Sequence, residues 1–100
     1  MALTGQPIDA GRALELGLVA RIAPPGQTLH AAVELAEQIA KNAPLALVAS
    51  KHLVKLGGTV SEDEFWDLQA PLFKGVFSLA DAKEGARAFV EKRPPKWRGV

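Results

Sequence analysis

Apolar residues recur at intervals of three and four along most of the chain, the spacing of one face of an α-helix. The final stretch has this pattern between Ser78 and a proline pair at Pro94 and Pro95. Ser78 three residues before Asp81 predicts an N-cap with a capping box, with Lys92 and Arg93 in the last turn before the prolines end the helix. Its apolar face consists of Leu79, Ala82, Ala86, Phe89 and Val90.

Similar patterns predict four earlier helices. Asp9 is a good N-cap for a short helix over 10–16, and Gly17 suits the left-handed position after it. Residues 18–23 alternate weakly and predict at most one short extended stretch. A second helix is expected over 28–41, with a buried stripe formed by Leu29, Ala32, Val33, Ala36, Ile39 and Ala40.

The third helix is expected over 44–56, with Pro44 in its first turn. Ser61 with Glu64 predicts the start of a fourth, in which Pro71 should produce a bend. Its apolar residues fall into two rows, Phe65, Leu68, Leu72 and Val76, then Trp66, Phe73 and Phe77. Two apolar rows favour either an interface with another body or internal packing. The sum is an all-α unit of about five helices.

Composition narrows the class of protein. The 100 residues are 48% hydrophobic and 23% charged, with a net charge of +1, which is typical of a globular domain and gives no reason to expect nucleic acid. Cysteine is absent, which excludes disulfides and thiolate chemistry. No apolar run approaches the ~18 residues of a membrane helix, so no membrane partner is expected and the cytoplasm is the default location.

Candidate chemistry is sparse. The acidic run Glu62 to Glu64 lies in the first turn of a helix, where negative charge offsets the helix dipole, and this favours a structural role over acid–base catalysis. His30 and His52 lack a partner at a catalytic spacing. Four of the twelve basic residues lie in the last nine positions, which indicates a local anion site or a solubilising tail. Phe89 and Lys92 are three residues apart, so they share one side of the helix. They either bind the ring and the phosphate of one ligand, or are a core aromatic residue beside a solvated lysine.

A series of short motifs carries a resemblance to a known family. In order, they are LTG (3–5), IDA (8–10), RALELGLV (12–19), APP (23–25), A-x-x-I-A-x-N-A-P-L-A (36–46), DAKEG (81–85) and AFVEKRPPKW (88–97). Together these motifs resemble the C-terminal portion of the enoyl-CoA hydratase/isomerase (crotonase) family, over essentially the whole chain. The resemblance implies that residues 1–26 connect to a preceding spiral core. It also implies that residues 27–100 form a helical region for trimerisation and for covering the CoA site.

The resemblance also implies a function and a site. The parent protein would act on acyl-CoA thioesters, most simply by adding water to a 2-enoyl-CoA, with no prosthetic group. Phe89 and Lys92 match the family's CoA-binding positions, and Phe73 in the preceding helix is another aromatic residue near that site. The resemblance implies that Lys92 contacts a CoA phosphate and that Phe73 and Phe89 lie against the adenine or pantetheine portions. A homo-oligomer, a trimer or a dimer of trimers, is expected.

The family's catalytic residues precede these motifs. The chain by itself is therefore predicted to be a fragment, or a remnant of a longer protein, without activity. Isomerase or other crotonase-family chemistry stays open for the parent. A freestanding helical oligomerisation module without catalysis is the rival interpretation.

Overall fold

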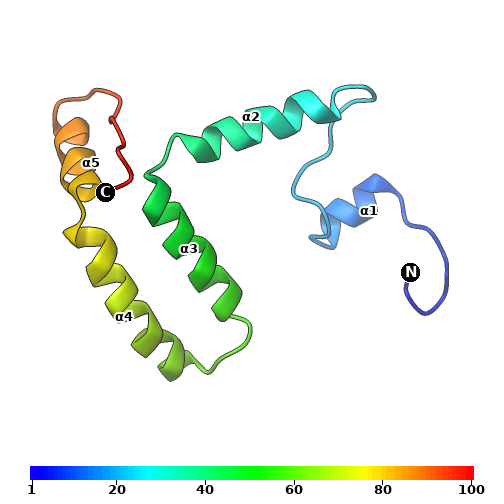
Figure 1. Cartoon of the computed structure of the whole chain (residues 1–100). Coiled ribbons are helices and arrows are strands. Elements are labelled where there is room, and N and C mark those ends of the chain that lie inside the picture. Colours follow the sequence, from blue (N-terminus) through cyan, green and yellow to red (C-terminus); the bar gives the residue numbers. More distant parts are fainter. The chain divides into compact units, whose positions relative to one another are not determined.

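The computed structural model describes residues 1–100 and contains five helices and no strand (Figure 1). The helices are α1 (Ala10–Glu15), α2 (Thr28–Ala40), α3 (Pro44–Leu56), α4 (Glu62–Ser78) and α5 (Ala80–Val90). The all-α prediction is confirmed, and residues 18–23 form no strand. The contacts divide the chain into two units, Met1–Glu37 and Gln38–Val100, which are described separately.

In the first unit, α1 is delimited by the two signals expected from the sequence. The Asp9 carboxylate accepts a hydrogen bond from the Arg12 backbone N–H at 2.7 Å, which satisfies one orphan donor of the first turn. Gly17 has a φ of 70°, and the Leu18 N–H returns to the Ala13 carbonyl at 2.9 Å. A left-handed residue followed by this long return bond is the Schellman helix end, which glycine adopts without steric cost.

The apolar stripe of α2 is not buried as the sequence suggested. Leu29 is 78% exposed, and Val33 and Ile39 are exposed as well. Helical spacing shows that these residues share a face, but it does not say which body covers that face. The prediction that this stripe is buried is wrong for this chain, because none of the α2 residues is buried.

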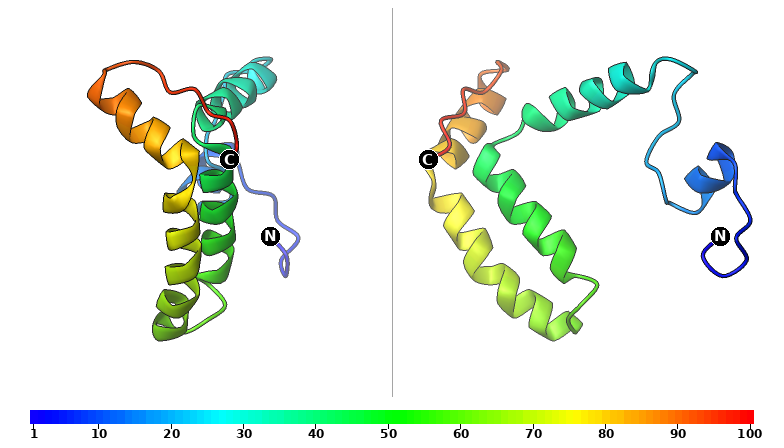
Figure 2. Two further views of the ribbon diagram at one scale, coloured as in Figure 1. Left: turned by 60° about the vertical axis from the view of Figure 1, so that its left-hand side comes forward. Right: turned by 45° about the vertical axis from the view of Figure 1, so that its right-hand side comes forward.

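In the second unit, α3 and α4 are antiparallel neighbours joined by residues 57–61 (Figures 1 and 2). Pro44 begins α3, and the Ser61 hydroxyl accepts from the Glu64 N–H at 3.4 Å at the start of α4. The two rows on α4 differ in burial. Phe65, Leu72 and Val76 are half-buried, whereas the second row is exposed, with Trp66, Phe73 and Phe77 at 54%, 55% and 62%.

The start of α5 differs from the sequence prediction. Ser78 is the last residue of α4, where its hydroxyl donates to the Gly75 carbonyl at 2.7 Å. Leu79 is the N-cap of α5 and makes no side-chain capping bond. The expected capping box is therefore wrong, because Ser78 bonds backwards into its own helix and the Asp81 carboxylate binds a different segment.

Almost nothing is fully buried in the chain. Ala88 is the one apolar residue below a tenth exposed, and Asp81, at 3%, is the one polar residue. Both lie on α5, under the C-terminal tail formed by residues 91–100, which runs back along the helix in both views of Figure 2. The best-packed part of the molecule is therefore the junction of α5 with this tail.

Candidate functional site

The tail is held to α5 by the buried carboxylate of Asp81. Its Oδ1 accepts from the Arg98 backbone N–H at 2.9 Å and its Oδ2 from the Gly99 N–H at 2.8 Å. In return, the Asp81 backbone N–H donates to the Val100 carbonyl at 3.0 Å. A buried carboxylate is costly unless it is well hydrogen-bonded, and two backbone donors supply those bonds.

Glu84, one turn further along α5, binds the tail a second time. Its carboxylate accepts two bonds from the Arg93 guanidinium, at 2.6 and 3.0 Å, and one from the Lys96 backbone N–H at 2.8 Å. Arg93 also donates to Glu91. The two-pronged arrangement of guanidinium on carboxylate fixes direction as well as distance, so the tail leaves the helix along one path.

Gly85 lies on α5 beside Glu84, and its lack of a side chain leaves room for the ring of Trp97. A Cβ at Gly85 would lie 3.1 Å from Cη2 of Trp97 and 3.4 Å from Cζ3, closer than ordinary contact. The Trp97 indole N–H donates to the Lys41 carbonyl at 2.7 Å, so the tail also ties the segment after α2. We call Asp81, Glu84 and Gly85, with their partners in residues 93–100, the tail clasp.

The contribution of the clasp to stability depends on pH in a predictable way. The hydrogen bonds from Arg93, and then from the Lys96 N–H, lower the pKa of the Glu84 carboxyl from 4.5 to about 2. Because the folded pKa lies below the unfolded one, the contribution of Glu84 to stability is complete above about pH 4.5 and is lost as the pH falls towards about 2.

We therefore expect the stability difference between the wild-type protein and Glu84→Gln to stay constant at neutral pH and to shrink in that acid range. Chemical denaturation at a series of pH values, from about 7 to about 2, measures this difference. A gap that persists unchanged to the acid end would contradict the assigned ion pair.

Lys92, one of the residues identified from the sequence, lies just beyond α5 rather than in its last turn. It has a φ of 52°, with its N–H on the Phe89 carbonyl at 3.2 Å, and the Arg93 N–H returns to the Ala88 carbonyl at 3.1 Å. This is the Schellman helix end with lysine in the place that usually holds glycine. The left-handed conformation costs a side-chain-bearing residue about 1 kcal/mol.

The two candidate aromatic residues lie in different surroundings. Phe89 is 85% exposed near the end of α5, next to the backbone turn that contains Lys92. Phe73 stacks on Phe77 of α4, with ring centroids 4.3 Å apart. The ring contacts of the chain do not pair Phe73 with Phe89. The chain thus brings Phe89 and Lys92 together at one helix end and places Phe73 on another element.

Phe73 and Phe77 also line an apolar cleft of about 270 Å³ between α3 and α4. A second apolar cleft, of about 380 Å³, lies where α3, α4, α5 and the tail meet, and Phe77 and Trp97 both contribute to it. These concave apolar surfaces are of the kind that receive a hydrophobic segment or the apolar part of a ligand.

The clasp residues were missed as a group in the sequence. Asp81, Glu84 and Gly85 are spaced i, i+3 and i+4, so they share one face of a helix, and a signal was therefore present. Two acids and then a glycine on one face, followed by a basic, proline-interrupted tail, indicate a tail folding back onto that face. The capping interpretation of Asp81 concealed it.

The chain contains neither a membrane-spanning helix nor a cluster of metal-binding side chains. None of the five helices combines the length and the apolar character needed to traverse a lipid bilayer. No three side chains of His, Cys, Asp or Glu come together in a way that would hold a metal ion. His30 approaches only Glu34, at 3.5 Å, and both side chains are exposed.

Comparison with known proteins identifies the family. The family model described as enoyl-CoA hydratase/isomerase matches residues 1–100. A Thermus thermophilus protein with enoyl-CoA hydratase in its name is 49% identical to this chain. The match covers 97% of this chain and 38% of the relative. Enoyl-CoA hydratase EchA19 of Mycobacterium tuberculosis is 40% identical over 98% of this chain and 37% of its own.

Solved structures agree with the sequence relatives. The crystal structure of an enoyl-CoA hydratase from Mycobacterium tuberculosis H37Rv superimposes with a TM-score of 0.94 at 47% identity, covering 99% of this chain and 39% of that one. The chain belongs to the enoyl-CoA hydratase/isomerase family. It spans about two fifths of the length of these relatives.

Proposed function

We propose that this chain is the C-terminal helical part of an acyl-CoA enzyme, most simply an enoyl-CoA hydratase that adds water to 2-enoyl-CoA thioesters. The family match along residues 1–100 supports the enzyme class. The observation that carries the role of this part is the Phe89 side chain, which is 85% exposed at the helix end where its backbone carbonyl accepts from the Lys92 N–H. A large apolar ring left in solvent at the same helix end as a cationic residue is a surface suited to a nucleotide-bearing ligand.

In this proposal Lys92 binds a phosphate of CoA, and Phe89 lies against its adenine or pantetheine portion. Phe73 supplies a second aromatic contact from α4. Because Phe73 does not pair with Phe89 within the chain, the proposal assigns them to different parts of the ligand or to neighbouring subunits. The CoA thioester is the substrate, and no prosthetic group is needed.

The chemistry is proposed to reside outside these 100 residues. Hydration of an enoyl thioester needs a positioned acid and base and donors for the developing oxyanion. The carboxylates of Asp81 and Glu84 already accept hydrogen bonds from the tail. His30 and His52 are exposed on their helices. The chain therefore contributes binding surface, and by itself it is expected to be inactive.

The proposal includes a homo-oligomer, a trimer or a dimer of trimers, and a cytoplasmic location. The exposed aromatic row of α4, formed by Trp66, Phe73 and Phe77, supports the oligomer. The reaction type within the family is the less constrained part of the proposal. A carnitinyl-CoA dehydratase of Proteus mirabilis is also similar, at 36% identity over 99% of this chain and 40% of its own. Isomerase activity is the other family chemistry to assay, since the deciding groups lie elsewhere.

A pair of variants of Lys92 in the intact protein tests the CoA assignment. Lys92→Met removes the charge but retains the strained left-handed turn, and Lys92→Gly removes the charge while relieving the strain. Loss of a remote phosphate contact removes mostly uniform binding. We therefore expect both variants to raise the KM for crotonyl-CoA about tenfold, with kcat changed by less than about twofold.

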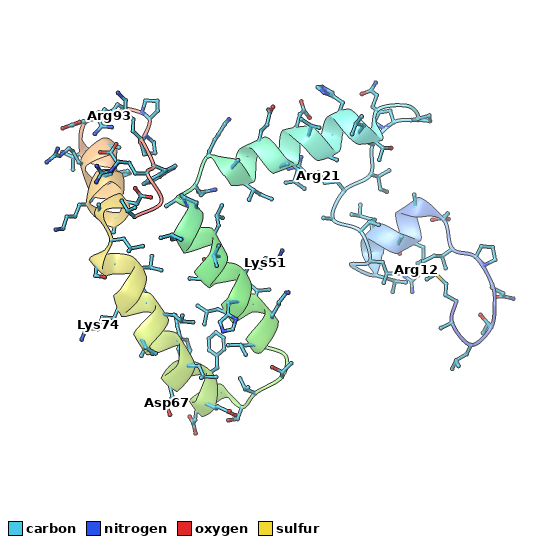
Figure 3. The ribbon with its side chains drawn as sticks, in the orientation of Figure 1. Arg12, Arg21, Lys51, Asp67, Lys74 and Arg93 are labelled. Carbon is cyan, nitrogen blue, oxygen red and sulfur yellow. The ribbon has the colours of Figure 1, made fainter.

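The control is Lys74→Met on α4, whose side chain points away from α3 (Figure 3) and which should leave both constants unchanged. If Lys92→Gly retained the wild-type KM while Lys92→Met did not, the effect would be due to the turn rather than to the charge. Unchanged KM in both variants would remove Lys92 from the site.

A further inference from the structure

The second unit has a strongly basic depression on the face of α5 where the tail returns. It has a volume of about 510 Å³, and its lining includes five cationic side chains. Lys83 and Arg87 come from α5, four residues apart and therefore on one face. Arg93, Lys96 and Arg98 come from the tail. Arg93 marks this end of the molecule in Figure 3.

The two carboxylates in the lining leave most of this charge unbalanced. Both oxygens of Asp81 bind backbone N–H groups of the tail, and Glu84 forms an ion pair with Arg93 alone. Lys83, Lys96 and Arg98 form no ion pair. Cations held together without partners repel one another, and an anion placed among them offsets that repulsion.

The tail is held against α5 by backbone hydrogen bonds together with the ion pair of Arg93 and Glu84. The side chains of Lys83, Lys96 and Arg98 take no part in these bonds. The Asp81 carboxylate fixes residues 98 and 99 through their N–H groups, and Glu84 fixes residue 96 in the same way. The basic tail is thereby held against the basic face of α5. This arrangement favours a bound anion because the cost of bringing the two basic segments together has already been met in folding.

We propose that this depression binds a phosphate-bearing anion, at a site separate from Phe89 and Lys92. Guanidinium groups bind phosphate oxygens in pairs, and ammonium groups add point charges around them. No aromatic side chain lines the depression, so it offers no partner for a nucleobase. The ligand class is a small phosphorylated compound or a polyphosphate, recognised through its phosphate groups. This inference does not depend on the CoA assignment.

Calorimetric titration of the intact protein with pyrophosphate tests the proposal. The variant is the double substitution Lys83→Gln and Arg98→Gln, which removes two charges but no side-chain hydrogen bond or ion pair. We expect the double variant to bind pyrophosphate at least about tenfold more weakly, and Lys74→Gln to bind it as the wild type does. ADP should bind about as well as pyrophosphate.

Three results would overturn the proposal. The first is no binding of pyrophosphate by the wild-type protein, and the second is equal binding by the double variant with an unchanged circular dichroism spectrum. The third is loss of pyrophosphate binding in Lys92→Met, which would merge the depression with the proposed CoA site. The CoA assignment is judged separately, from the KM for crotonyl-CoA in the Lys92 variants.

Discussion

Replacing Asp81 by alanine is expected to destabilise the C-terminal unit by about 3 kcal/mol, the largest effect of any single substitution in the clasp. The carboxylate is 3% exposed and accepts from the N–H groups of Arg98 and Gly99. Its removal leaves both donors without a partner in a place that water reaches poorly, and hydrogen bonds to a charged acceptor are worth about 1.5–3 kcal/mol each.

Hydrogen exchange of the tail amides in the intact protein measures this effect directly. About 3 kcal/mol corresponds to an increase of roughly a hundredfold in the exchange rates of residues 98 and 99. In Asp81→Asn, the exchange rates of residues 98 and 99 should lie between those of the wild-type protein and Asp81→Ala, because an amide oxygen still accepts a bond. Asp67→Ala, an exposed carboxylate on α4 (Figure 3), is the matched control and should change nothing. Unaltered exchange in Asp81→Ala would contradict the clasp.

Phe77→Asp is expected to abolish assembly of the homo-oligomer proposed above. The side chain is 62% exposed, it stacks on Phe73, and it contributes to both apolar clefts of the second unit. A carboxylate there would be buried unpaired if this face meets another subunit, at a cost of several kcal/mol. Sedimentation at micromolar concentration should then show a shift from oligomer to monomer.

Lys74→Asp introduces the same carboxylate on the side of α4 that points away from α3, and it should leave the oligomer intact. An oligomer that survives Phe77→Asp would remove this face from the interface. Assembly that depends on Phe77 in a protein without acyl-CoA turnover would favour the freestanding oligomerisation module over the enzyme.

The local features of the fold followed from the sequence because each depends on neighbours within four residues. Asp9 and Ser61 cap their helices as expected, Pro44 begins α3, and Gly17 takes the left-handed position. The two apolar rows of α4 were also predicted, and the structure buries one of them more deeply than the other. Hydrogen bonds of this range are favoured by residue type and spacing. Ser78 is the exception, because its hydroxyl donates to the Gly75 carbonyl instead of capping α5.

The features that sequence reasoning missed depend on distant segments. Asp81 suited a local capping role, but the tail reaches it across 17 and 18 residues. The stripe of α2 is exposed, because helical spacing predicts which residues share a face but not what covers that face. In the candidate site, the three-residue spacing of Phe89 and Lys92 predicted that both lie at one helix end. The spacing did not predict that Lys92 lies beyond the last residue of the helix. Their role in binding CoA stays a prediction, as does a functional division after residue 26.

The clasp also has a consequence for the order of folding. Its bonds close a loop of fewer than twenty residues, and the entropy lost on closing a loop rises only slowly with its length. Contacts within such a loop can form without waiting for a second molecule. By this reasoning α5 and its tail fold as a local unit, before any contact that the exposed face of α4 makes with a second molecule.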